Sequence, residues 1–163
     1  LVPWLKEGRG DLIAASFTVT PEREKELAFS KPYLFARQML VEKAGSPMLA
    51  SLRALKGKTI HVRKSSSYRE AIERLRAKYG PFEIVHAPES LETEQLIRRV
   101  ARGEIPATVS DSHILDVELA YQSAAAGTLS LAEEAAPNKG LQPIVFAMRP
   151  ANAKLRILVV STW

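Results

Sequence analysis

The alternation of short apolar strands with amphipathic helices constrains the fold of this 163-residue chain more than any other feature. Between residues 46 and 136, segments that predict strands take turns with segments that predict helices. In chains with this order, successive strands pair in parallel and each helix crosses back over the sheet. The region therefore predicts a complete small α/β lobe, with strands at 59–63, 82–85, 107–109 and 128–131.

Helices are expected between these strands. The best-marked one begins at Ser66 or Ser67 and runs to about Tyr79, where Gly80-Pro81 ends it. Its apolar positions share one face at the spacing of an amphipathic helix: Tyr68, Ala71, Ile72 and Leu75. The other expected helices are a short one over 49–55, one that Ser90 caps and Gly103 ends, one that Asp111 and Ser112 open, and a terminal one over 151–160.

Two long segments that predict strands, 35–42 and 141–148, flank this region. This is the pattern of one lobe inserted into another, with two crossover strands as the hinge. We therefore expect residues 44–137 to form the inserted lobe. Residues 1–43 and 138–163 would form an incomplete first lobe with the hinge strands. Because the chain opens on what reads as the end of an apolar helix, over residues 1–5, we also expect a segment before residue 1.

The composition excludes several classes of site. There is no Cys, which excludes disulfides, thiol nucleophiles and Cys-based zinc sites. His61, His86 and His113 lie too far apart in sequence for metal-ligand spacing, so no metal and no cofactor are expected. The net charge is +5, but basic residues are mixed with acids and read as solvated faces. Nucleic acid is therefore not an expected partner, and a polyanion-binding domain is the lesser alternative.

Three places follow a strand and open a helix, where small ligands bind in α/β proteins. In the first, Ser16 and Thr18 alternate with apolar residues, and Arg23 lies one turn into the next helix. Two hydroxyls and a guanidinium predict a cradle for a carboxylate, which arginine binds through two parallel hydrogen bonds. The alternative is that Thr20 only caps the helix and Arg23 only pairs with Glu22 or Glu26.

The second place is the run Ser65-Ser66-Ser67, whose N–H groups and helix N-terminus favour an anion. The third is Asp111, which could receive a ligand's ammonium group. The alternative at both is an ordinary helix cap. A hydrolytic triad of Ser66, His113 and Asp111 is disfavoured, because no GxSxG elbow accompanies these residues.

Three motifs, at their spacing, resemble the signature of the family 3 bacterial extracellular solute-binding proteins. They are G-x-x-D at 8–11, T-x-T-P-E-R at 18–23 and F-S-x-P-Y at 29–33. Within that family, the stretches 65–68 and 107–113 are most similar to the regulatory domain of the membrane-bound lytic transglycosylases F. The resemblance implies an α/β periplasmic-binding-protein-like type II fold of two lobes with a two-strand hinge, here N-terminally truncated.

The resemblance also implies a function and a role for each site residue. The chain would bind an amino acid or a peptidoglycan-derived peptide in a cleft between its lobes. Arg23 would hold the ligand carboxylate beside Ser16 and Thr18, with Ser66 and Ser67 on the second lobe. Asp111 would accept the ligand ammonium.

The resemblance leaves two contexts for such a module, both in the periplasm. In one, the module regulates an attached transglycosylase whose catalytic domain lies outside this chain and whose protein is membrane-anchored. In the other, it is a free receptor that delivers its ligand to an ABC-type amino-acid transporter. The chain itself is expected to carry no catalytic residue in either.

Overall fold

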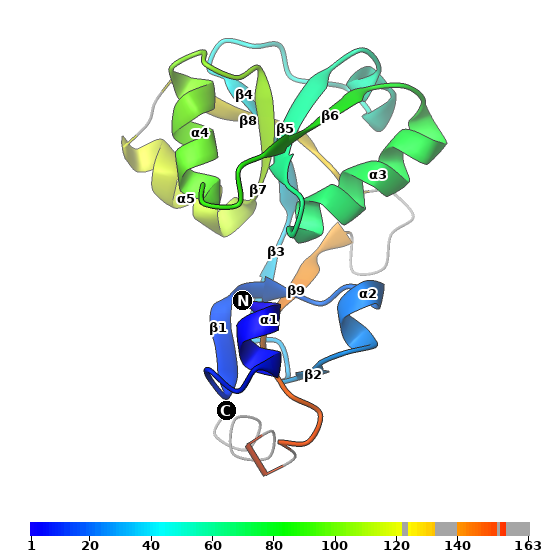
Figure 1. Cartoon of the computed structure of the whole chain (residues 1–163). Coiled ribbons are helices and arrows are strands. Elements are labelled where there is room, and N and C mark those ends of the chain that lie inside the picture. Colours follow the sequence, from blue (N-terminus) through cyan, green and yellow to red (C-terminus); the bar gives the residue numbers. More distant parts are fainter. Residues whose placement is uncertain (122–123, 133–139, 153, 156–163) are drawn as a thin grey trace. The chain divides into compact units, whose positions relative to one another are not determined.

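A computed structural model describes residues 1–121, 124–132, 140–152 and 154–155. The chain forms two compact units (Figure 1). Unit 1 comprises residues 1–36 and 142–163, and unit 2 comprises residues 37–141. Each is described by itself below.

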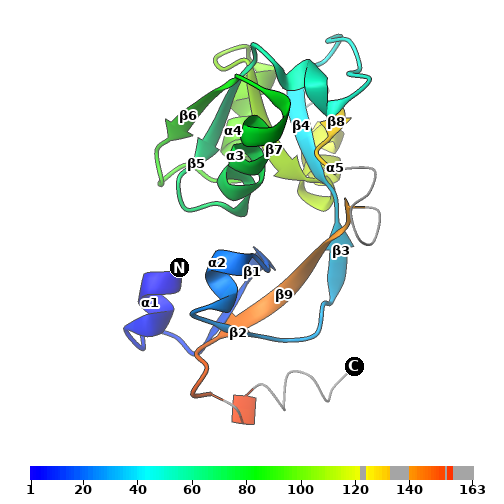
Figure 2. The same ribbon diagram turned by 90° about the vertical axis from the view of Figure 1, so that its right-hand side faces the viewer.

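Unit 1 is built around one strand. β9 (Gln142–Met148) pairs with β1 (Leu12–Thr18) on one side and with β2 (Ala28–Phe29) and β3 (Leu34–Ala36) on the other. All of these pairings are antiparallel. Figure 2 shows β9 running through unit 1 beside β2 and β3.

Two short helices complete unit 1, α1 (Val2–Lys6) and α2 (Pro21–Glu24). One apolar cluster joins α1 to the sheet: Leu5, Ile13, Phe17, Leu27 and Ala147. The guanidinium of Arg149, just past β9, donates to the carbonyls of Leu5 at 2.8 Å and Gly10 at 2.7 Å and pairs with Asp11. These bonds tie the α1–β1 turn to the end of the central strand.

Unit 2 holds a five-stranded sheet in the order β6-β5-β7-β4-β8. The strands are β4 (Gln38–Lys43), β5 (Thr59–Arg63), β6 (Glu83–Ala87), β7 (Ala107–Asp111) and β8 (Ala125–Ser130). β5 runs parallel to both β6 and β7, and β4 runs antiparallel to β7 and β8. The parallel α/β lobe expected from the alternating pattern is confirmed in these strands.

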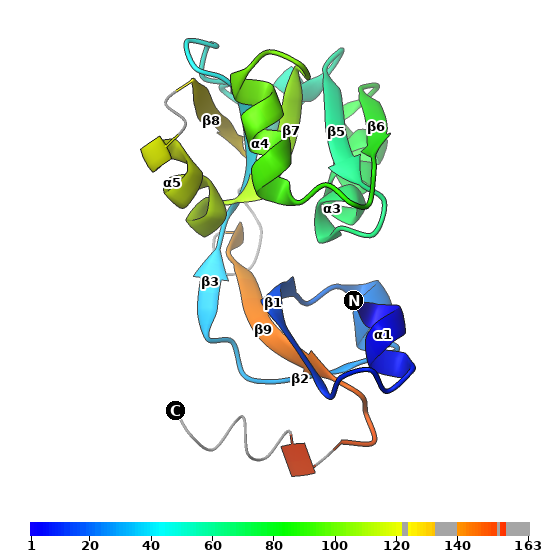
Figure 3. The ribbon, with the colours of Figure 1, turned by 60° about the vertical axis from the view of Figure 1, so that its left-hand side comes forward.

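Helices cover both faces of this sheet (Figure 3). On one face η1 (Leu52–Leu55) and α3 (Ser67–Tyr79) pack against strand residues such as Leu40 and Ile60. On the other face α4 (Thr93–Ala101) and α5 (Ser112–Tyr121) pack against Val41. Leu40 and Val41 belong to opposite clusters because successive strand residues point to opposite faces.

Several expected boundaries differ in the structure. The single strand expected over 35–42 is two strands, β3 and β4, which join different sheets. Arg37 separates them, because its N–H donates to the Ser112 hydroxyl at 3.2 Å and its carbonyl accepts the Ser112 N–H at 2.7 Å. The helix expected over 49–55 is the shorter η1.

The predicted ends of α3 are confirmed, but the predicted start of α4 is not. Gly80 ends α3 with a φ of +99°, a conformation that glycine adopts without strain, and Ser66 caps its start as expected. The predicted cap Ser90 is wrong, since Glu92 caps α4 through a capping box with Gln95. Most of the terminal helix expected over 151–160 lies outside the described residues.

The α4 face of unit 2 supplies a stability prediction. Ile97 is fully buried in the cluster around Val41, so Ile97→Ala should lower the free energy of unfolding by about 2–5 kcal/mol through lost burial and a cavity. Val117 on α5 is 61% exposed, so Val117→Ala should change it by less than about 0.5 kcal/mol. Urea denaturation followed by circular dichroism measures both, and equal losses would contradict the assignment of this core.

Candidate ligand-binding site

Arg23 in unit 1 is held by its neighbours on β1 and at the start of α2. Its backbone N–H donates to the hydroxyl of Thr20, the N-cap residue of α2, at 3.3 Å. Its Nη1 donates to the Thr18 carbonyl at 2.8 Å, and its guanidinium carbon lies 4.0 Å from the centre of the Phe17 ring. A guanidinium stacked on a ring and bonded at one edge has a fixed plane, which suits recognition of a flat carboxylate.

Ser16 lies in an irregular part of β1. Ile13 pairs with Ala147 and Phe17 pairs with Val145, so four steps along β1 face two along β9. Within this bulge Ser16 has a φ of +46°, a value that residues other than glycine rarely adopt. Bulges and strained residues of this kind concentrate at functional sites.

The bulge changes the expectation for the two hydroxyls. The strand expected to end at residue 15 continues to Thr18, so both residues lie within β1 and not after it. The pairing of β1 with β9 is interrupted between Ile13 and Phe17. The rule that every second side chain of a strand points to the same side therefore does not apply across Ser16, and it no longer predicts that the Ser16 and Thr18 hydroxyls point the same way. Ser16 is half-buried, and Thr18 is 2% exposed.

In unit 2, three helix N-termini share one edge of the sheet. β5, β6 and β7 run parallel, so their carboxyl ends meet there, and α3, α4 and α5 begin within a few residues of those ends. Figure 3 shows these helix starts below the strands. The first N–H groups of a helix have no partner within it, so such an edge is rich in hydrogen-bond donors.

Ser66 and Ser67 begin α3, and both are buried. The Ser66 hydroxyl donates to the Arg63 carbonyl at 2.8 Å and accepts the Arg69 N–H at 3.3 Å. Its side chain is therefore engaged as a cap, and its proton goes to the Arg63 carbonyl and not to His113, as a hydrolytic triad would require. The Ser66 N–H also donates to the Arg63 carbonyl, at 3.2 Å, so both polar groups of Ser66 have partners within the chain. The ligand roles of Ser66 and Ser67 stay predictions.

Asp111, the last residue of β7, is 1% exposed and belongs to a small polar cluster. The Tyr68 hydroxyl accepts the Asp111 N–H at 3.1 Å, and it is also hydrogen-bonded to the side chains of Asp111 and Thr93. Burial, together with the nearby Asp111 carboxylate, holds the pKa of Tyr68 well above its usual range. A neutral phenol thus connects the starts of α3 and α4 with the end of β7.

Glu89 supplies a second carboxylate at this edge, in the loop between β6 and α4. Its Oε1 accepts the Ser65 N–H at 3.0 Å, and its Oε2 accepts the Ser65 hydroxyl at 2.5 Å. The serine loop was expected to attract an anion, and this bond shows that one of its N–H groups already holds the chain's own carboxylate.

Each unit gathers its own share of the predicted residues. Unit 1 brings together Thr18 and Arg23, and unit 2 carries Ser66, Ser67 and Asp111 at one edge of its sheet. Sequence reasoning missed Phe17, Tyr68 and Thr93 as members. Tyr68 had been assigned to the apolar face of α3 from its spacing, and only its phenolic oxygen, which usually needs a partner when buried, could have signalled otherwise.

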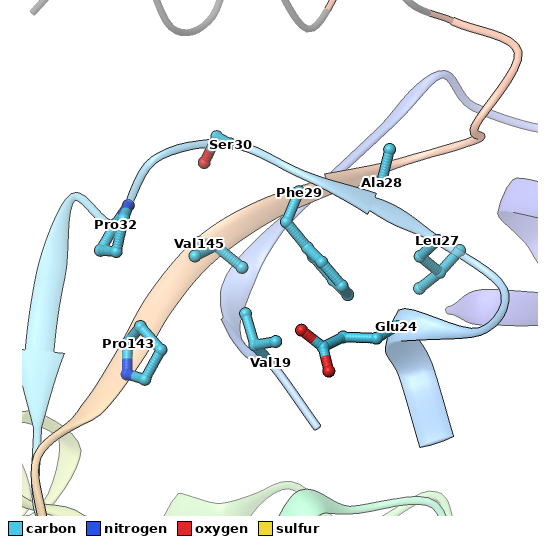
Figure 4. A pocket seen from close by; sticks show the side chains of 9 residues that line it. All are labelled: Val19, Glu24, Leu27, Ala28, Phe29, Ser30, Pro32, Pro143 and Val145. Atoms are coloured by element: carbon cyan, nitrogen blue, oxygen red, sulfur yellow. The ribbon is translucent and has the colours of Figure 1, made fainter. Parts of the chain in front are cut away.

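Unit 1 also contains a pocket of about 480 Å³ (Figure 4). It is lined mainly by apolar side chains, with the carboxylate of Glu24 pointing in. None of the six predicted ligand residues lines it. In the described part of the chain, no three His, Asp or Glu residues are grouped as a metal site would require, and no helix is long and apolar enough to cross a membrane.

The two α/β units and their strand orders define a type II periplasmic-binding-protein fold. An arginine-bound mutant of ArgBP from T. maritima superposes with a TM-score of 0.79 at 25% identity, over 99% of this chain and 70% of that one. The substrate-binding protein AbpA of Streptococcus pneumoniae, from an amino acid ABC transporter and bound to L-arginine, gives 0.80 at 21% identity, over 99% and 64%.

The chain belongs to the bacterial extracellular solute-binding proteins, family 3, whose family model matches residues 1–159. It is 34% identical over 152 residues to the membrane-bound lytic murein transglycosylase F of Desulfosudis oleivorans. That match covers 93% of this chain but only 32% of the relative, so the chain spans about a third of the relative's length.

The Tyr68 cluster supplies a second prediction. Tyr68→Phe removes the hydroxyl and leaves the buried Asp111 N–H without its acceptor, so the free energy of unfolding should fall by about 1–3 kcal/mol. Tyr79→Phe, on the same helix but only half-buried, is the control and should change it by less than about 0.5 kcal/mol. Urea denaturation measures both, and an unchanged Tyr68→Phe protein would mean that the phenol does not secure Asp111.

Proposed function

We propose that this chain binds a small ligand carrying a carboxylate and an ammonium group, an amino acid or a peptidoglycan-derived peptide. Residues of both units would contact the ligand, as in the two-lobed binding site expected from the sequence. The observation that carries the proposal is the fixed guanidinium of Arg23, stacked on Phe17 and bonded to the Thr18 carbonyl.

The chemistry of the two units is complementary in this proposal. Arg23 would bind the carboxylate through two parallel hydrogen bonds, with Ser16 and Thr18 beside it. On unit 2 the N–H of Ser67 would add a donor at the helix N-terminus that Ser66 caps. Asp111 would take the ammonium, since a buried carboxylate is stabilised by an opposite charge within a few ångströms.

We further propose that the module regulates a longer protein of the lytic transglycosylase F kind, in the periplasm and anchored to the membrane through that protein. Support comes from the match to such a relative, which covers nearly all of this chain and about a third of the relative. Binding would then bias the two units toward one arrangement and so control the attached enzyme. No catalytic role falls to this chain in the proposal.

Replacing Arg23 tests the ligand claim. Isothermal titration with L-arginine, L-glutamine and a muropeptide should give heat with at least one of them for the wild-type domain. Arg23→Met should weaken that binding by about 2–4 kcal/mol, which is roughly 30-fold or more, because a charged hydrogen-bond pair to the carboxylate is lost.

Arg9→Met is the matched control, because Arg9 is also a unit 1 arginine lying against an aromatic ring, that of Trp4 at 5.5 Å. It should bind like wild type. A folded wild-type sample that gives no heat with any of these probes would refute the ligand claim, and unchanged binding by Arg23→Met would refute the assignment of Arg23.

A free receptor for an ABC-type amino-acid transporter is the alternative, and this fold also occurs in the arginine-bound AbpA. The full reading frame separates the two. A transglycosylase domain encoded after residue 163 would support the regulatory module, whereas a stop codon near that position would support the free receptor.

A further inference from the structure

The bond between Ser65 and Glu89 joins two loops of unit 2, at the edge of the sheet where α3, α4 and α5 begin. Ser65 lies between β5 and α3, and Glu89 lies between β6 and α4. Both oxygens of the carboxylate are used, one for the Ser65 N–H at 3.0 Å and one for its hydroxyl at 2.5 Å. A two-point bond of this kind fixes the loop in position and in orientation.

The carboxylate is held in its charged form. Burial alone would raise the pKa of Glu89, but hydrogen bonds from the Ser65 side chain and N–H, the nearby Arg63 and the Lys64 N–H outweigh it and lower the pKa. Glu89 is therefore ionised at neutral pH, and the bonds to Ser65 are charge-assisted.

The same loop is held from its other side. Arg69 Nε donates to the Lys64 carbonyl at 2.8 Å, and Ser66 donates to the Arg63 carbonyl at 2.8 Å. Arg63 in turn pairs with Glu92, the N-cap of α4, at 2.9 Å. Glu89 is thus one of two carboxylates that join the start of α3 to the start of α4.

We propose that Glu89 is a positioning residue for ligand binding, which acts as a built-in anion on the serine loop and sets where the Ser66 cap and the N–H of Ser67 lie. The inference rests on the proposed function, because the position of the serine loop matters for binding only if this loop contacts the ligand. Glu89 itself would not touch the ligand. By occupying the Ser65 N–H and hydroxyl, it would also confine a ligand anion to the N–H groups that follow.

The chain offers a matched control at the opposite end of the same two strands. There the Thr59 hydroxyl on β5 donates to Glu83 on β6 at 2.9 Å, again a hydroxyl–carboxylate bond between these neighbours. Both glutamates are exposed, so replacing either by glutamine should leave the core intact. Only the Glu89 pair lies beside the predicted ligand residues.

Hydrogen exchange tests the positioning without any ligand. In Glu89→Gln the neutral side chain cannot make both charge-assisted bonds, so amides of residues 64–67 should exchange about tenfold faster than in wild type. Glu83→Gln should leave them unchanged, and Glu89→Asp should restore part of the protection. Equal exchange in Glu89→Gln and wild type would overturn the inference, whether or not a ligand is found.

Titration with L-arginine and the muropeptide tests the consequence. Glu89→Gln should bind about tenfold more weakly than wild type, while Glu83→Gln binds normally. If wild type binds, Arg23→Met does not, and Glu89→Gln equals wild type, the positioning role is wrong and the proposed function stands. If wild type binds none of L-arginine, L-glutamine and the muropeptide, the proposed function is refuted and the exchange data alone decide the positioning.

A pH profile separates a charge effect from a change of shape. Because the pKa of Glu89 is lowered in the folded protein, its contribution is present above the ordinary carboxyl range and is lost as the pH falls through the lowered value. Protection of residues 64–67 in wild type should therefore decline at acidic pH, and Glu89→Gln should lack that step. The same decline in both proteins would overturn the role of the charge.

Discussion

The parallel course of β5, β6 and β7 is the constraint on which the polar edge of unit 2 depends. Parallel strands end at the same edge, and each is followed by a helix whose first N–H groups have no partner within it. Unpaired N–H donors therefore gather at this edge of the sheet, and some of them need acceptors from the chain itself when no ligand is bound. Side chains of the chain itself accept hydrogen bonds from some of these donors. The Ser66 hydroxyl caps α3, the Tyr68 hydroxyl accepts the Asp111 N–H, and the Glu89 carboxylate accepts the Ser65 N–H.

Unit 1 reaches its polar site by another route. Its sheet is antiparallel around β9, so the described strands of unit 1 do not end together at a row of helix starts, and the candidate site depends on one irregular strand. The bulge in β1 puts Ser16 in a strained conformation just before Phe17 and Thr18, the two residues that orient Arg23. An aromatic face on one side and a backbone carbonyl on the other limit the guanidinium to few orientations. Preorganisation of this kind reduces the entropy lost on binding.

The two units also differ in how far the sequence could predict them. Apolar periodicity led to the parallel strands and to α3, because burial on a sheet face repeats every few residues. It could not separate β3 from β4, since residues 35–42 read as one continuous strand and the break at Arg37 is made by Ser112, 75 residues away. The start of α4 was missed for a different reason: serine is a common cap and glutamate an uncommon one, so Ser90 gives the stronger local signal although Glu92 is the cap. The Ser65–Glu89 bond joins residues 24 apart and has no local signature.

The hydroxyl and carboxylate residues at the unit 2 edge illustrate why a residue type does not determine a role. Ser65, Ser66 and Ser67 are adjacent, yet one hydroxyl bonds a carboxylate of the next loop and one caps a helix. The two acids differ as well. Glu89 is exposed and has its charge satisfied by the serine loop, so it gains little from a ligand cation. Asp111 is almost fully buried and hydrogen-bonded to a neutral phenol, in surroundings where a charged group depends on its polar partners. Of the two, Asp111 is therefore the carboxylate to which we assign the ligand ammonium in the proposed function.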